Sequence, residues 1–207
     1  NMSLKTILSE YLPLCRDPVV WGFATINPLI LGGFVSYITT SSYYYIQVLG
    51  LSISTHGYII GISIFANVLV SLWVSHLIER FEPLVIFKAG VALAILGVAF
   101  FGAFIVADMT NPYLLIIPCA FVSAALGCVF PPSTSLIMER HRSRAGSVSS
   151  FLAMIRTFIM AAALLLSGID YSLTLFSTAG ILMGSILLAR IIYVPFMRWV
   201  VPNALEA

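Results

Sequence analysis

Long apolar stretches, separated by short polar segments, occupy most of this chain. A membrane-spanning helix needs roughly 20 mainly apolar residues, and six stretches meet that requirement. They are Val19–Tyr43, Gly57–Leu77, Leu84–Ala107, Tyr113–Met138, Gly146–Leu166 and Leu173–Val194. The short connections favour antiparallel neighbouring helices, so the pattern predicts an all-α integral membrane protein with a six-helix transmembrane bundle.

Residues 1–18 have a different, amphipathic pattern. Apolar residues at positions 4, 7, 8, 11 and 12 share one helical face, and polar residues lie opposite. This spacing predicts a short helix on the cytoplasmic membrane surface that ends at Pro13, which lacks a backbone N–H. We therefore divide the chain into a linker helix (1–18), the bundle (19–198) and a cytoplasmic tail (199–207). Because the chain begins with Asn1 rather than Met, we expect it to be a piece of a longer polypeptide.

The basic residues indicate how the bundle is oriented. All but one of the ten lie at or near the same side of the predicted spans, namely Lys5, Arg16, Arg80, Lys88, Arg140, Arg142, Arg144, Arg190 and Arg198. The three loops on the other side contain no Lys or Arg. Cytoplasmic loops carry an excess of basic residues, so both termini are predicted to be cytoplasmic. Arg156 is the exception.

The composition agrees with a membrane protein and excludes several other classes. Hydrophobic residues make up 60% of the 207 residues and charged residues only 9%, against about 25% charged residues in a soluble domain. A net charge of +2 is too small to indicate nucleic-acid binding. The three cysteines have neither a disulfide framework nor a metal-binding spacing, and we predict no metal and no cofactor.

Polar residues within the spans are candidates for the lining of a cavity, because they are costly in lipid. Ser63 and Asn67 belong to a stripe of polar residues that repeats every four positions along the second span. In the first span, Asn27 precedes a proline that is expected to kink the helix, and Tyr37 is placed to stack on a flat ligand. The alternative for the serines is close helix packing through small residues.

Arg156 is the most informative of these residues. Counted from the cytoplasmic edge at Gly146, it lies about 15 Å deep, where a charge costs about 2.5–3.5 kcal/mol on insertion scales. No Asp or Glu lies inside a predicted span. The countercharge must come from a substrate, a water-filled cavity, backbone carbonyls or another polypeptide segment. Two interpretations stay open, a functional arginine that meets an anion and a structural arginine bonded to carbonyls.

Enzyme activity and water conduction are not supported by the motifs. The sequence has no G-x-S-G, no H-E-x-x-H and no intramembrane pair of aspartates. The tripeptides that begin at Asn27 and Asn111 are similar to the Asn-Pro-Ala motifs of aquaporins, but one lies inside a span and the other in an external loop. We predict neither an enzyme nor a channel.

The segments G-G-F-V-S-Y-I-T-T-S-S-Y-Y-Y-I, F-A-N-V-L-V and S-H-L-I-E-R-F-E-P follow one another along the chain. In this order they resemble the C-terminal half of a major facilitator superfamily transporter of the Bcr/CflA drug-exporter group. G-G-F-V-S-Y-I-T-T-S-S-Y-Y-Y-I is similar to the seventh helix of that group, with Ser42 in place of the usual proline. F-A-N-V-L-V is similar to the eighth helix and places Asn67 on its common asparagine. S-H-L-I-E-R-F-E-P resembles the cytoplasmic G-x-x-x-D-R-x-G-R loop, in which Arg80 matches and Glu79 stands for Asp.

Two later segments continue the resemblance. G-C-V-F-P-P-S-T-S is similar to the tenth helix and has Pro131 followed by Pro132 where P-N is usual. R-A-G-S-V-S-S-F-L-A-M-I-R-T-F is similar to the eleventh helix, with Gly146 near its start and Arg156 on a polar position. By this resemblance we expect Glu79, Arg80, Pro131 and Gly146 to belong to loop and conformational motifs.

The resemblance implies half of a secondary active transporter in a bacterial inner membrane, which exports drugs or small amphipathic metabolites in exchange for protons by alternating access. The implied partners are the lipid bilayer, a small-molecule substrate, protons, and either the N-terminal six-helix half or a second copy. The expected substrate-binding residues are Arg156, Asn67, Tyr37, Asn27 and Ser63. The alternatives are a non-transporting scaffold subunit and a stand-alone homodimer.

Overall fold

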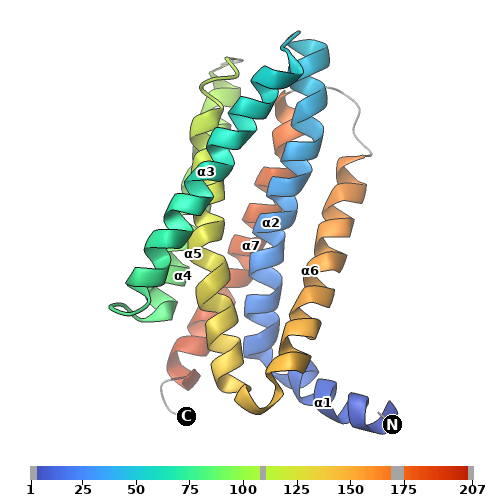
Figure 1. The fold of residues 1–207 in the computed structure, drawn as a ribbon, viewed down its shortest axis with the longest axis vertical. Helices are drawn as coiled ribbons and strands as arrows, with labels where there is room; N and C mark the ends of the chain where they lie inside the picture. The colour runs from blue at the N-terminus through green and yellow to red at the C-terminus, as the bar shows by residue number, and fades with distance from the viewer. Residues whose placement is uncertain (1–3, 108–110, 169–174, 205–207) are drawn as a thin grey trace.

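The computed structural model describes residues 4–107, 111–168 and 175–204, and the side chains of 10–107, 111–168 and 179–200. The described residues form helices joined by short turns and contain no strand (Figure 1). In chain order the helices are α1 (Leu4–Arg16), α2 (Pro18–Tyr43), a π-helical turn η1 (Tyr44–Val48), α3 (Ile53–Leu77), α4 (Pro83–Val106), α5 (Ile116–Arg140), a 3₁₀ turn η2 (Arg142–Arg144), α6 (Ala145–Ser167) and α7 (Leu175–Ala204). Within the described residues, six helices are long and apolar enough to cross a membrane, which confirms the predicted all-α bundle.

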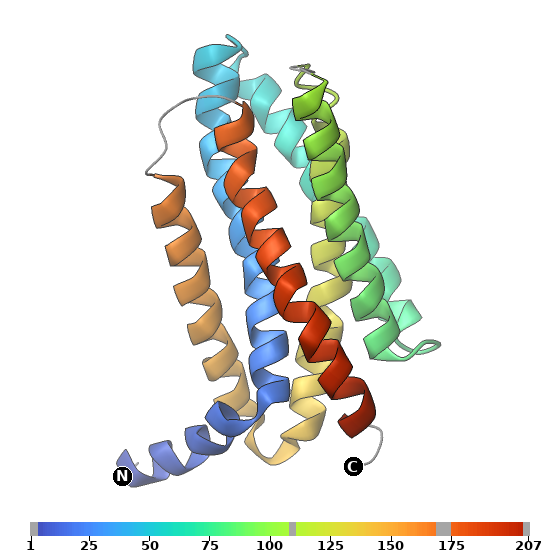
Figure 2. The same cartoon turned by 180° about the vertical axis from the view of Figure 1, so that it is seen from behind.

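The bundle is organised around α2 and α5, whose apolar stretches are mostly buried, whereas those of the other four spans are mostly exposed. Helix α2 packs against α5, α6 and α7, and α5 packs against α2, α3 and α4. Figure 1 shows α3, α5, α2 and α6 towards the viewer, and Figure 2, from behind, shows α4 and α7. The molecule therefore has a front face made by α3, α5, α2 and α6.

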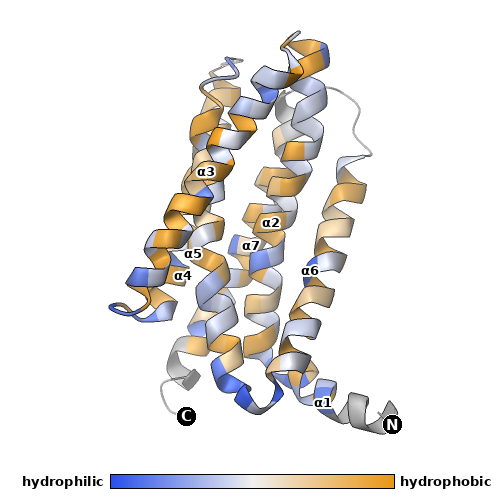
Figure 3. Ribbon diagram, viewed as in Figure 1, coloured by the Kyte–Doolittle hydropathy of each residue, from blue (hydrophilic) through white to orange (hydrophobic). Residues whose placement is uncertain are grey.

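The surface of the bundle suits a lipid environment. Figure 3 shows hydrophobic colour along the lengths of the helices and hydrophilic colour gathered at the turns, including the turn between α5 and α6. Large apolar side chains such as Phe65, Trp73 and Phe158 are well over half exposed. Exposed aromatic and aliphatic groups on this scale are costly in water and favourable in hydrocarbon.

The prolines interrupt the helices less than the sequence predicts. The prediction that the first helix ends at Pro13 was wrong, because α1 continues to Arg16. Leu14, just beyond the proline, is fully buried, and Tyr11 packs against Phe151 of α6 with ring centroids 6.3 Å apart. Packing on both sides of the proline holds the helical geometry at the cost of one backbone hydrogen bond.

Proline 28 in α2 and the Pro131–Pro132 pair in α5 also lie inside continuous helices. Helix α7 runs through Pro195 to Ala204, ten residues beyond the Val194 end that the sequence predicts. As a consequence Arg190 lies inside the last span rather than at its edge, with its guanidinium carbon 5.5 Å from the centroid of the Tyr193 ring.

Two glycines of α4 permit its close approach to α5. A Cβ on Gly97 would lie 2.6 Å from a Val122 methyl and 3.1 Å from the Pro118 carbonyl oxygen. A Cβ on Gly90 would lie 2.8 Å from the Cys128 Cβ. Small residues that let backbones approach are a common basis of helix packing in membranes.

We predict that Gly97→Leu separates α4 from α5 and lowers the thermal stability of the protein in detergent, because overpacking costs about 1–3 kcal/mol. Gly184→Leu is the matched control, since a Cβ on Gly184 meets no atom within 4 Å. The control should unfold at the wild-type temperature or slightly higher, because leucine is the better helix former. Equal melting temperatures for the two variants would contradict the packing role of Gly97.

The turns that carry basic residues lie at one end of the bundle. The start of α2, the α3–α4 turn and the α5–α6 turn all belong to this end, which holds Arg16, Arg80 and the arginines of 140–144. The positive-inside rule predicts that this end faces the cytoplasm.

Cysteine labelling tests the orientation. Cys15 is exposed at this end, whereas Cys119 and Cys128 are buried. We expect a membrane-impermeant maleimide to label the protein in inside-out vesicles and not in right-side-out vesicles. Cys15→Ser should abolish the signal, which assigns it to that thiol. Labelling from the outside alone would reverse the predicted orientation.

Candidate functional site

Two neighbouring cavities lie on the front face. The first, which we call the α6 cavity, has a volume of about 180 Å³ and is lined by residues of α2, α5 and α6. The second, the α3 cavity, has a volume of about 350 Å³ and is lined by α2, α3 and α5. Asn27 and Phe130 line both. The cavities are therefore adjacent compartments of one candidate site, and no residue of α4 or α7 is among their linings.

The polar groups of this site share one depth in the membrane. Asn27 is nine residues after the start of α2, Arg156 eleven after the start of α6, and Phe130 ten before the end of α5. At 1.5 Å per residue these positions lie about 14–17 Å from the basic end of the bundle. That is half of a hydrocarbon core of about 30 Å.

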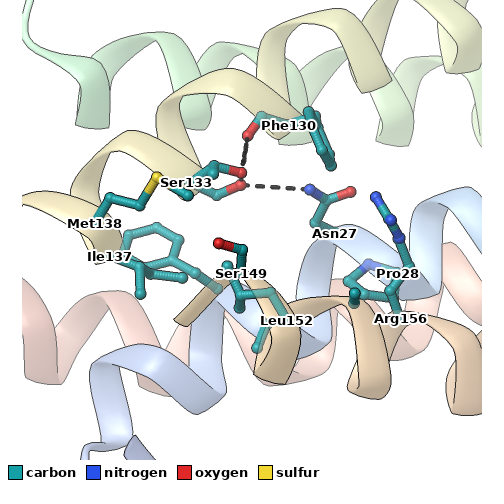
Figure 4. A pocket seen from close by; sticks show the side chains of 13 residues that line it. Asn27, Pro28, Phe130, Ser133, Ile137, Met138, Ser149, Leu152 and Arg156 are labelled. Atoms are coloured by element: carbon teal, nitrogen blue, oxygen red, sulfur yellow. Dashed lines mark hydrogen bonds between the residues drawn. The ribbon is translucent and has the colours of Figure 1, made fainter. Parts of the chain in front are cut away.

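Asn27 lies at the junction of the two cavities. Its side chain is only 6% exposed, and its Nδ2 donates a hydrogen bond to the Ser133 hydroxyl at 3.4 Å (Figure 4). Its Oδ1 has no hydrogen-bond partner among the described residues. A buried acceptor without a donor costs about 1–3 kcal/mol. In addition, the following Pro28 has no N–H to donate to the Ala24 carbonyl one turn earlier.

Arg156 enters the α6 cavity from α6. Ser149, Leu152 and Ala153 line the cavity on the same helical face, because residues three, four and seven apart share a face. The guanidinium carbon lies 5.8 Å from the centroid of the Phe130 ring, a cation–π arrangement. In Figure 4 the guanidinium points towards the Asn27 side chain. No ion pair joins Arg156 to a carboxylate within the described part of the chain.

Asn67 lies in the α3 cavity and joins α3 to α5. Its Nδ2 donates to the backbone carbonyl of Ser123 at 2.8 Å, and the Ser123 hydroxyl is buried without a partner in the described structure. The polar stripe of α3 thus faces α5, where a Cβ on Gly127 would lie 2.9 Å from the Ser71 hydroxyl. Both interpretations of the stripe apply, because Asn67 and Ser71 line a cavity and also pack against a helix.

The structure does not bring Tyr37 and Ser63 into the cavities. Tyr37 is fully buried, shares a 2.8 Å hydrogen bond with the Tyr45 hydroxyl and packs edge-on against Phe101. The Ser63 hydroxyl is also fully buried and donates to the carbonyl of Ile59 on its own helix. The expectation that Tyr37 stacks on a flat ligand is not supported by this arrangement, because the core already covers its ring.

The predicted loop and conformational residues are distributed over the basic end and α5. Glu79 and Arg80 are exposed in the α3–α4 turn and form no ion pair among the described residues. Gly146 is exposed near the start of α6 with open space around it. Pro131 lines the α3 cavity.

Sequence reasoning missed several residues of the site, among them Phe130, Ser123 and Ser133 of α5. Ser123 and Phe130 are seven residues apart, and Ser133 follows three later. A search of this span for polar residues near one face would have found the two serines. Phe130 had no such signal, since an apolar residue in a span is typical of packing or lipid contact.

A polar cluster joins the same helices at their basic ends. The Asp17 carboxylate accepts hydrogen bonds from Arg140 Nε at 2.7 Å, from His141 Nε2 at 3.0 Å and from the Val19 amide at 2.9 Å. Partial burial by itself would raise the pKa of Asp17, but these donors outweigh it and hold the pKa below its usual value. The cluster ties the start of α2 to the end of α5, beyond the α6 cavity.

Fold and site together define a multi-pass α-helical membrane protein with cavities between its helices at the middle of the membrane. The family model of the Major Facilitator Superfamily matches residues 3–164, well over half of the chain. The chain belongs to this superfamily of membrane transporters. No curated protein and no solved structure matches the chain.

We predict that Asp17→Asn lowers the melting temperature in detergent at pH 7 by about 2–4 °C, the shift expected for loss of about 1 kcal/mol in a domain of this size. Because the pKa of Asp17 is depressed on folding, its charge contributes stability above the unfolded pKa of about 3.9, and that contribution is lost as the pH falls through the folded pKa. The difference between wild type and variant should therefore shrink below about pH 4. A difference that does not change between pH 7 and pH 3 would contradict the role of the charge.

Proposed function

We propose that the chain is the C-terminal six-helix half of a secondary active transporter of the Bcr/CflA group, which exports drugs or small amphipathic metabolites across the inner (plasma) membrane in exchange for protons. The observation that carries the proposal is the pair of cavities at the middle of the membrane, both lined only by the helices of the front face. Membership of the Major Facilitator Superfamily supports a transport function. The resemblance of the helix motifs to that group supplies the subgroup and the position in the fold.

The front face supports the presence of a second helical unit. The two cavities are open concavities between the helices of this face. A second bundle placed against this face would convert the concavities into an enclosed site. We infer that this bundle is the N-terminal half of the same transporter, and a second copy of the chain is the alternative.

Alternating access fits the arrangement of the cavities and of the polar cluster. In transporters built from repeated bundles, substrate is held near the midplane while one bundle rocks against the other. Asn27, Phe130 and Arg156 lie at this depth, and the Asp17–Arg140–His141 cluster joins α2 to α5 at the cytoplasmic end. The cluster would then keep α2 and α5 together as one body while the bundle moves.

Proton coupling requires groups beyond those described. Within the described residues, the acidic side chains lie in α1, at the ends of the spans and in the turns: Glu10, Asp17, Glu79, Glu82 and Glu139. None of these five lies in the interior of a span, where a proton-carrying carboxylate would be expected. We therefore propose that the proton-carrying groups belong to the partner bundle.

Reconstitution tests the proposal. The protein, with everything that its natural reading frame encodes, is placed in vesicles with a proton gradient and screened for flux of amphipathic compounds. We expect flux that collapses with a protonophore, and we expect Arg156→Ala to lower it about tenfold or more, because hydrogen bonds to a charged group contribute about 1.5–3 kcal/mol.

Arg190→Ala is the matched control. Arg190 also lies in a span beside an aromatic ring but is outside both cavities, so flux should stay near the wild-type rate. Membrane insertion and yield should be equal in all variants. Normal insertion without proton-driven flux of any compound would favour the scaffold alternative, and equal loss in both variants would contradict the site.

A further inference from the structure

The charge balance of the α6 cavity points to the class of substrate. The polar side chains of its lining are Asn27, Ser133, Thr134, Ser149 and Arg156, and Arg156 is the one that carries a charge. Phe130 faces the guanidinium at 5.8 Å and stabilises it without neutralising it. The described acidic residues lie in α1, at the ends of the spans and in the turns, at a different depth. A cation held in this way attracts an anion that enters the cavity.

Asn27 gives an independent sign that the site is built for a ligand. It is 6% exposed, it lines both cavities, and its Oδ1 has no partner within the described chain. Its Nδ2 is already engaged with Ser133. The amide oxygen is thus an orphaned buried acceptor in the same space as a guanidinium with unused donors (Figure 4). An anionic ligand that binds beside these two residues would supply the countercharge for Arg156.

The α3 cavity supplies room for an apolar body. Its volume of about 350 Å³ is within the range of small-molecule sites. Most of its lining is apolar, with Leu31, Phe34 and Ile64 among the contributors. Because Asn27 and Phe130 line both cavities, this apolar compartment adjoins the space in front of Arg156.

We propose that the site selects small organic monoanions with an apolar body, and that Arg156 is the residue that determines the preference for negative charge. The inference rests on the proposed transport function, since it assigns a substrate class to the same site. The guanidinium is suited to this role because its planar donors match a carboxylate in a bidentate manner. A carboxylate of a partner helix is the competing countercharge. The guanidinium is turned into the cavity, towards α2, which favours a solute over such a helix (Figure 4).

Equilibrium binding in lipid nanodiscs tests the inference separately from transport. The probes are naphthoate, its neutral amide naphthamide and the cation naphthylmethylammonium, which share one ring system and differ in charge. The protein again contains everything that its reading frame encodes. We expect naphthoate to bind about ten- to hundredfold more tightly than naphthamide, the range for a charge-assisted contact, and naphthylmethylammonium to bind most weakly.

Variants at position 156 identify the source of the preference. Arg156→Gln should weaken naphthoate binding about ten- to hundredfold and leave naphthamide within about twofold. Arg156→Lys, which keeps the charge but loses the planar fork, should fall between wild type and Arg156→Gln. Arg190→Gln should bind all probes like wild type, because Arg190 is outside both cavities.

Three results would overturn the inference: no binding of naphthoate to the wild-type protein, no preference for naphthoate over naphthamide, or an equal loss of all three probes in Arg156→Gln. The last result would indicate that Arg156 pairs with a partner carboxylate and shapes the site as a whole. If Arg156→Gln does not fold, the order of affinities of the three probes for the wild-type protein still tests the proposed preference for an anion. Failure of the proposed function is distinguishable, because it would abolish proton-driven flux while the charge preference in binding remained.

Discussion

Hydrocarbon offers the backbone no hydrogen-bond partners, and this constraint governs the whole structure. Each apolar stretch satisfies its own N–H and C=O groups by forming a helix, and the described spans are accordingly helical throughout. The same constraint explains why three of the prolines inside the spans are informative. Pro28 and the Pro131–Pro132 pair each remove a donor from a helix, and all three belong to helices that line the cavities. Carbonyls released by a proline are tolerated where neighbouring helices or ordered water replace the lost donor.

The hydrophobic effect does not drive helices together in lipid. Their association depends instead on close packing of small residues and on hydrogen bonds between helices. Gly90 and Gly97 bring α4 against α5, and the bond from Asn67 to the Ser123 carbonyl joins α3 to α5. These contacts make α4, α5 and α3 one group. Helix α6 packs chiefly against α2 and makes few contacts with α5, its neighbour in sequence. The α6 cavity lies in the space between α5 and α6, bounded by α2.

A charge in such a space is costly unless a countercharge or other polar groups balance it. Arg156 is stabilised by Phe130, but a ring face does not replace an anion. The orphaned oxygen of Asn27 beside it is a second polar group at this depth that has no partner among the described residues. The same reasoning explains why Tyr37 is not part of the site. Its hydroxyl already shares a hydrogen bond with the Tyr45 hydroxyl in the core, so it does not require a ligand as a hydrogen-bond partner.

The sequence alone determined the number of spans, the end of the bundle that carries the basic turns, and the depth of Arg156, Asn27 and Asn67, because these depend on local hydrophobicity and on the fixed rise of a helix. It did not determine the continuation of α1 through Pro13 or of α7 to Ala204, since tertiary packing can offset the local cost of a proline. Nor did it separate Asn27 and Arg156, which share a cavity, from Tyr37 and Ser63, which lie in the core. That distinction depends on how each helix is rotated about its axis and which neighbour it meets. The rotation of each helix and its neighbours are set only in the packed bundle, in which α2 and α5 lie at the centre.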